Sequence, residues 1–175
     1  FWMMLPWTLK MPLGHLVDLI WHHKSGLIIL GAGLLFASVL IMIGLIGSPD
    51  GMRELLPIET WFVLSALLGP IGYVLQDTVA DAMTVEEVPR VDLEGRAVDE
   101  EQLRLAHTTM QTLGRVAIIG GTVLVAAVNV YLFSGVESLS KLEKAAVYLQ
   151  IYRLALIIPA VSVLGVALAA ILRWR

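Results

Sequence analysis

The sequence predicts an all-α membrane protein, a polytopic bundle of about five transmembrane helices. Two observations carry this prediction. First, 58% of the 175 residues are hydrophobic and only 15% are charged, whereas soluble domains average roughly 45–50% apolar and about 25% charged residues. Second, the apolar residues are collected in runs of about 20 or more, which is the length of helix that crosses a hydrocarbon core of about 30 Å. A soluble domain of this length could not bury so much apolar surface.

Five runs have the length and composition of membrane spans, and we expect them to form a single transmembrane domain. In order they cover about 1–20, 26–46, 60–83, 108–133 and 146–172. The second run is the clearest, because it contains no charged residue. Three runs contain prolines, which are Pro6 and Pro12 in the first, Pro70 in the third and Pro159 in the fifth. These prolines are expected to loosen the helix backbone, as membrane helices tolerate where neighbours satisfy the freed groups.

The connection 85–107 is the one long polar segment and is predicted to be cytoplasmic. If the spans alternate in direction, the side that holds this loop carries Lys24, Arg90, Arg96, Arg104, Arg173 and Arg175, and the opposite side carries Arg53, Lys141 and Lys144. Cytoplasmic loops carry the excess of Lys and Arg. We therefore expect an integral protein of a bacterial cytoplasmic (inner) membrane. Because the chain opens at Phe1 directly in an apolar run, we also expect it to be part of a longer protein.

An acidic pair ends the third predicted span. Asp77 and Asp81 are four residues apart and so share one face of a helix. Charge at membrane depth is costly and usually marks function. Three roles remain open for these acids. They can form an ion pair with Arg115 of the next span, they can take up and release a proton, since burial and nearby charge shift a carboxyl pKa, or they can bind loop backbone at the helix end.

Three further polar residues within the predicted spans are candidates for binding a solute. Lys10 lies about halfway along the first span, where either an anionic substrate or a buried carboxylate would offset its charge. Arg153 lies one or two turns into the last span, and Asn129 lies within the fourth. Each has a simpler interpretation: a long basic side chain can reach the interface, and a buried amide can hold two helices together.

The segment from Gly14 to Lys24 resembles the loop signature of the major facilitator superfamily. That signature has a glycine, an acid four residues later and basic residues at its end, and Gly14, Asp18 and Lys24 occupy these places. Leu19 stands where the family has arginine, and Trp21 where it has glycine. The resemblance implies a gating role for Asp18, which in the family holds the closed loop against the opposite half of the protein.

The spacing of the acidic pair extends this resemblance. If residues 1–20 are the second helix of the family fold, Asp77-Thr78-Val79-Ala80-Asp81-Ala82 falls at the cytoplasmic end of the fourth. It looks like the acidic stretch of a subset that comprises the folate–biopterin transporters, the muropeptide permeases and the bacteriochlorophyll-associated carriers. The resemblance implies a partial major facilitator fold, helices two to six of twelve, with Asp18, Asp77, Asp81 and Arg115 as gating or ion-pair residues.

The resemblance implies secondary-active transport, by symport or another ion-driven exchange, of a small organic solute. Lys10 and Arg153 make an anion the expected cargo. The alternative is a non-transporting scaffold or assembly subunit of a larger membrane complex, such as a photosynthetic one. No enzyme is expected, because we find no nucleophile triad, metal cluster or phosphate-binding glycine loop. The chain has no cysteine and no basic cluster, so we expect no cofactor, no metal and no nucleic-acid partner. The expected partners are lipid, the remaining helices, the solute and other membrane subunits.

Overall fold

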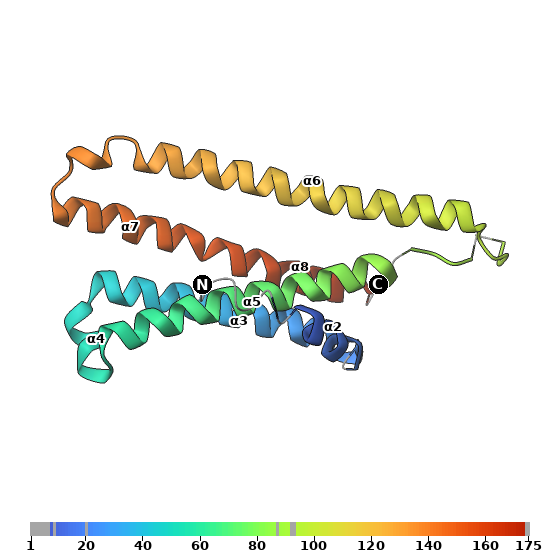
Figure 1. The fold of residues 1–175 in the computed structure, drawn as a ribbon, viewed down its shortest axis with the longest axis horizontal. Helices are drawn as coiled ribbons and strands as arrows, with labels where there is room; N and C mark the ends of the chain where they lie inside the picture. The colour runs from blue at the N-terminus through green and yellow to red at the C-terminus, as the bar shows by residue number, and fades with distance from the viewer. Residues whose placement is uncertain (1–7, 9, 20, 87, 92–93, 174–175) are drawn as a thin grey trace. The chain divides into compact units, whose positions relative to one another are not determined.

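The computed structural model describes residues 8, 10–19, 21–86, 88–91 and 94–173. Their regular structure is helical apart from one isolated antiparallel bridge between Val91 and Ala97. Figure 1 shows the helices, which are α2 (Lys10–Leu19), η1 (Trp21–His23), α3 (Lys24–Gly47), α4 (Pro49–Leu55), α5 (Ile58–Glu86), α6 (Glu100–Phe133), η2 (Val136–Ser138), α7 (Lys141–Ala155) and α8 (Ile157–Arg173). The predicted all-α fold is confirmed.

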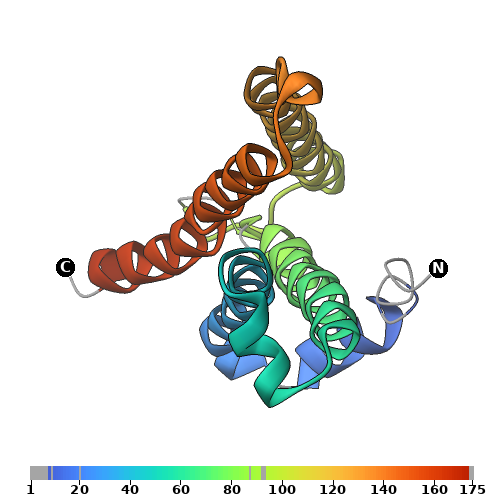
Figure 2. The same ribbon diagram turned by 90° about the vertical axis from the view of Figure 1, so that its left-hand side faces the viewer.

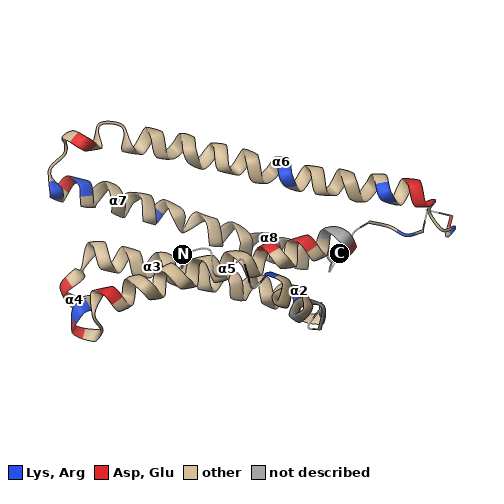
Figure 3. Cartoon of the chain, in the orientation of Figure 1, with Lys and Arg blue, Asp and Glu red and all other residues tan. Residues whose placement is uncertain are grey.

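Four helical stretches among the described residues are long and apolar enough to cross a membrane. They are Lys24–Gly47, Ile58–Met83, Glu100–Ser138 and Lys141–Leu172, and they contain the second to fifth predicted spans. The central helix α3 has no charged residue after Lys24, as Figure 3 shows. The first predicted span, about 1–20, lies partly outside the described residues, and α2 is its described part. The chain is an all-α membrane helix bundle.

The chain divides into two compact units. One comprises residues 1–79 and 135–175, and the other comprises residues 80–134, so that the boundary falls within α5. In the first unit α3 is central, because it contacts α7 and α8 and is hydrogen-bonded to α5. Helices α3 and α5 run antiparallel, and α4 forms the turn between them (Figures 1 and 2).

The turn at α4 is fixed by local chemistry. Pro49 occupies the start of α4, where its missing N–H needs no partner and its fixed φ suits a helix. The indole Nε1 of Trp61, at the beginning of α5, donates a hydrogen bond of 3.0 Å to the carbonyl oxygen of Met52. The Met52 side chain in turn lies against Gly44 of α3. These contacts hold the two long helices together at one end.

Helix α6 begins at Glu100, earlier than the predicted start of the fourth span at about 108. Asp99 precedes the helix, and Glu100 and Glu101 lie in its first turn, where negative charge stabilises the helix N-terminus. With 34 residues and a rise of 1.5 Å per residue, α6 is about 51 Å long. It therefore exceeds a hydrocarbon core of about 30 Å, and part of the helix must project from it.

The last predicted span consists of two helices that break at Leu156, between α7 and α8. Pro159 lies in the first turn of α8 and has no N–H to continue the hydrogen-bond ladder from α7. Helix α5, by contrast, continues through Pro70 without interruption. At its other end α7 starts with a capping box, in which Ser140 and Glu143 bond each other's backbone N–H.

Candidate functional site

The candidate site lies where α2 meets α5. Lys10, Gly14 and Val17 follow one another at intervals of four and three residues, and they therefore share one face of α2. Val17 is fully buried, and a Cβ added at Gly14 would lie 3.9 Å from the Thr78 methyl group. A Cβ at Gly14 would thus make ordinary van der Waals contact with Thr78, which shows that α2 lies against α5 at the height of the acidic segment.

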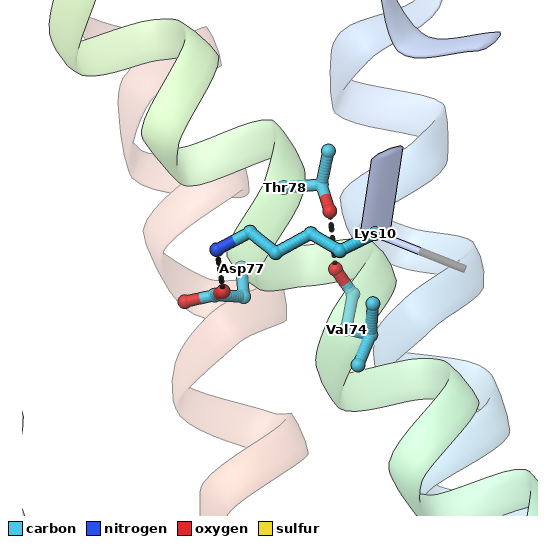
Figure 4. Close-up of polar contacts among 4 residues, drawn as sticks. All are labelled: Lys10, Val74, Asp77 and Thr78. Carbon is cyan, nitrogen blue, oxygen red and sulfur yellow. Dashed lines mark hydrogen bonds and ion pairs between the residues drawn. The ribbon is translucent and has the colours of Figure 1, made fainter. Parts of the chain in front are cut away.

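An ion pair joins the two helices at this place. Lys10 Nζ lies 2.7 Å from Asp77 Oδ2, as Figure 4 shows. The side chain of Asp77 is 17% exposed and that of Lys10 is 37% exposed. A charge-assisted hydrogen bond of this length is among the stronger polar contacts in a protein. The carboxylate is therefore mostly covered, while the lysine side chain is covered less completely.

The described residues of α5 beside Asp77 are buried and mostly apolar. Thr78 is 6% exposed, and its hydroxyl donates a hydrogen bond of 2.8 Å to the carbonyl oxygen of Val74 in its own helix (Figure 4). Val74 and Val79 are fully buried. Apolar surroundings lower the local dielectric, which strengthens an ion pair and makes an unpaired charge costly.

The ion pair bears on the predicted roles of Lys10 and Asp77. Of the two ways to offset the charge of Lys10, a buried carboxylate is the one that the structure contains. Asp77 therefore has a basic partner on α2. This pairing was not predicted from the sequence. Arg115 lies on α6 and is exposed. Because Arg115 belongs to the second unit, its ion pair with the acidic segment stays a prediction.

The other acidic candidates differ from Asp77. Asp81 lies one turn further along α5 and is exposed, so the two acids of the predicted pair have different surroundings. Asp18 lies in α2, but its side chain is outside the described residues. The gating roles of both residues stay predictions.

The contacts of the described residues do not bring the other substrate candidates to the ion pair. Arg153 is exposed in the last turn of α7, where a cation is stabilised by the negative end of the helix dipole. Asn129 is half-buried on α6. Neither side chain has a hydrogen-bond or ion-pair partner within the described part of the chain.

The crossing of α3 and α5 contains contacts that sequence reasoning missed. A Cβ added at Gly72 would lie 2.5 Å from the carbonyl oxygen of Gly31, and one added at Gly31 would lie 2.8 Å from the carbonyl oxygen of Gly72. The two backbones therefore touch. The amide Nε2 of Gln76 donates a hydrogen bond of 3.1 Å to the carbonyl oxygen of Ile28, one turn further along the same contact.

A sequence signal for this crossing exists. Ser65, Gly69, Gly72 and Gln76 are spaced by four, three and four residues, so they form one stripe of small or polar residues along α5. Such stripes are typical of closely packed membrane helices. From the sequence, only Pro70 in this part of the span was interpreted, as a break in the backbone, and the spacing of the stripe was not used.

Comparison with known proteins adds no relative. No family model, no curated protein and no solved structure matches the chain. The resemblance to the major facilitator superfamily therefore depends on the motifs around Asp18 and Asp77 alone, and it stays a prediction.

Proposed function

We propose that the protein is a secondary-active transporter of the major facilitator type, which moves a small organic anion by alternating access in a bacterial cytoplasmic membrane. The observation that carries the proposal is the ion pair between Lys10 and Asp77, which joins two helices in an apolar bundle and is only partly buried. Polar pairs in membrane helices are typical of substrate and ion pathways.

The proposed mechanism uses exchange of partners at Lys10. A carboxylate of the cargo that reaches Lys10 competes with Asp77 for its ammonium group. Loss of the ion pair frees α2 from α5, while α3 and α5 remain together through their direct backbone contact. Asp18, Asp81 and Arg115 would hold the closed states, Arg153 and Asn129 would add cargo contacts, and an ion or proton gradient would drive the cycle.

The test is uptake by the intact protein in proteoliposomes, with radiolabelled succinate, benzoate and glutamate as probe anions. Lys10→Ala should reduce uptake of an accepted anion at least tenfold, and Lys10→Arg should restore part of it. Lys141→Ala is the matched control, because Lys141 is an exposed lysine at the start of α7. Equal uptake by wild type and Lys10→Ala would remove Lys10 from the site, and absence of uptake of any anion would defeat the proposal.

One observation favours the alternative, a scaffold subunit of a larger membrane complex. Residues 116–128 of α6 are apolar apart from Thr122, so this helix offers a long apolar surface that other membrane subunits can contact. The intact mass decides between the two. A mass of roughly 40–50 kDa, as about twelve spans require, supports the transporter, whereas a mass near 19.1 kDa within a stable complex supports the scaffold.

A further inference from the structure

The turn between α2 and α3 carries basic side chains that the proposed function does not use. Three consecutive residues, His22, His23 and Lys24, lead from the short helix η1 into the start of α3. The side chains of His22 and His23 are exposed, and that of Lys24 is half-buried. We call these three residues the basic turn. All of them belong to the first unit, as do α2 and α3.

The depth of the basic turn in the membrane follows from the length of α3. This helix has 24 residues, which correspond to about 36 Å at a rise of 1.5 Å per residue. No charged residue follows Lys24 in it. A hydrocarbon core of about 30 Å therefore takes up most of the helix, and each end of α3 extends only a few ångströms beyond the core. The basic turn thus lies in the layer of the lipid headgroups.

Exposed apolar side chains lie on both sides of the basic turn. Leu19, the last residue of α2, is 72% exposed, and Ile29 and Leu30, in the second turn of α3, are 49% and 54% exposed in the same unit. Ile29 and Leu30 lie about 8–9 Å deeper in the membrane than Lys24. A ligand that contacts both levels needs an anionic group and, about one and a half helical turns deeper, hydrocarbon chains.

The carboxylate of the ion pair at α2 and α5 lies deeper than the basic turn. Gln76 is hydrogen-bonded to the carbonyl oxygen of Ile28, which follows Lys24 by about one helical turn. Asp77 is the next residue after Gln76 and has Lys10 as its partner. This pair therefore contributes no net charge at the level of the basic turn.

The other charged groups around the basic turn nearly balance one another. The charged residues and further histidine at this end of the neighbouring described helices are His15 and Asp18 of α2, Asp81 and Glu86 of α5 and Arg173 of α8, which contacts α3. While the histidines are neutral, two cations, Lys24 and Arg173, stand against three acids. Histidine ordinarily changes its charge between pH 5 and 8. When His15 and the two histidines of the turn are protonated, the cations outnumber the acids.

We propose that the basic turn binds the headgroup of an anionic phospholipid and that protonation of His22 and His23 strengthens this binding. A cation close to an anionic membrane surface raises the affinity by about fivefold. The cytoplasmic leaflet, where this turn is predicted to lie, has the negative surface potential that such a site requires. The inference goes beyond the proposed function, because a bound lipid is not cargo.

The test is binding of dioctanoyl phosphatidylglycerol, an anionic phospholipid, to the intact protein in an uncharged detergent. Dioctanoyl phosphatidylcholine, which has the same acyl chains and a zwitterionic headgroup, is the reference lipid. The dissociation constants are obtained from the rise of the melting temperature with lipid concentration, at about pH 7.5 and about pH 5.5. We expect the dissociation constant of the anionic lipid to be at least fivefold lower at the acidic pH, and that of the reference lipid to stay the same. Equal behaviour of the two lipids would overturn the inference.

Substitution of the two histidines tests where the pH dependence arises. His22→Gln combined with His23→Gln keeps polar side chains that take up no proton, so this variant should lose most of the pH dependence. His22→Lys combined with His23→Lys should bind the anionic lipid tightly at both pH values. His107→Gln, which changes a half-buried histidine of α6, is the control and should behave like wild type. A glutamine double variant that keeps the full pH dependence, or a lysine double variant that binds no more tightly than wild type at the higher pH, would contradict the proposed site.

A soluble anion separates a lipid site from a general anion site. Glycerol 3-phosphate has the phosphate of a lipid headgroup and no acyl chains, so it cannot contact Leu19, Ile29 and Leu30. It should bind at least tenfold more weakly than the anionic lipid, and equal affinity would mean that a free anion is the ligand. Lipid binding does not require transport. A protein that binds the anionic lipid and takes up no anion would keep the lipid site and lose the transporter, and uptake without selective lipid binding would do the reverse.

Discussion

Ser38 of α3 and Ser65 of α5 each donate a hydrogen bond to the other's backbone carbonyl oxygen, at 2.9 and 3.0 Å. Both residues are buried, at 9% and 4% exposure. The arrangement satisfies two hydroxyl groups and links two helices without any long side chain. Together with the contact of Gly31 and Gly72, it joins α3 and α5 at two places along their crossing.

Loss of one of these hydroxyl groups should weaken the bundle measurably. Hydrogen bonds between membrane helices contribute about 0.6 kcal/mol on average and up to about 1.7 kcal/mol, so Ser65→Ala should lower the free energy of unfolding within that range. The measurement is reversible unfolding in detergent micelles. Ser162→Ala is the control, because the Ser162 hydroxyl bonds only the Ile158 carbonyl of its own helix. Equal stability of the two variants would contradict the interhelical role.

A methyl group at the backbone contact should be more damaging. In Gly72→Ala the new Cβ would lie 2.5 Å from the Gly31 carbonyl oxygen, so the helices must separate. Overpacking of this kind costs about 1–3 kcal/mol, which should appear as a lower melting temperature. Gly33→Ala, also on α3, is the control because its Cβ would meet nothing within 4 Å. If both alanines melt like wild type, the two backbones are not in contact.

The ion pair between Lys10 and Asp77 should show energetic coupling. Lys10→Met removes the basic partner of a mostly covered carboxylate, and Asp77→Asn removes the carboxylate that Lys10 contacts, so each change should destabilise the protein. The double variant should lose less than the sum, by on the order of 1 kcal/mol, since the pair is only partly buried. A double-mutant cycle on unfolding free energies measures this term.

The loop between α5 and α6 offers a matched comparison for that cycle. Arg96 and Glu94 form an ion pair whose side chains are 74% and 65% exposed, so their coupling energy should be close to zero. Equal coupling in the two pairs would mean that the surroundings of Lys10 and Asp77 do not strengthen their interaction.

The orientation of the chain can be tested in the same loop. Gly95 has a φ of +78°, which an L side chain rarely adopts, so the exposed neighbour Ala97 is the better site for a probe. Ala97→Cys should react with an impermeant thiol reagent in inverted vesicles and not in intact cells, because the loop is predicted to be cytoplasmic. Reaction in intact cells would reverse the orientation.

The fold class could be predicted because it follows from quantities that need no three-dimensional information. The charge-free run 26–46 is long enough to span a membrane and too apolar for anything else, and α3 covers it. The ends of the helices were harder to predict from the sequence. The start of α6 at Glu100 reflects helix-favouring acids in a polar stretch, and hydropathy does not register a helix that continues outside the membrane.

The residues of the candidate site were predicted from the sequence, but the contacts between them were not. Lys10 and Asp77 were each singled out because charge within an apolar run is rare. Their pairing was not, because 67 residues separate them and nothing in the spacing says which helices are neighbours. The backbone contact of Gly31 and Gly72 was not predicted for a related reason. A glycine in the sequence indicates a close approach of two helices only when the residues that face it are known.

The separation of Lys10 and Asp77 along the chain also has a consequence for biogenesis. A ribosome that adds about 5–20 residues per second needs several seconds to pass from the lysine to its carboxylate, 67 residues later. During that interval α2 has no counterion from α5. The order of synthesis thus makes α2 wait for the same helix that later packs against α3, because α5 carries both Asp77 and the contact with α3.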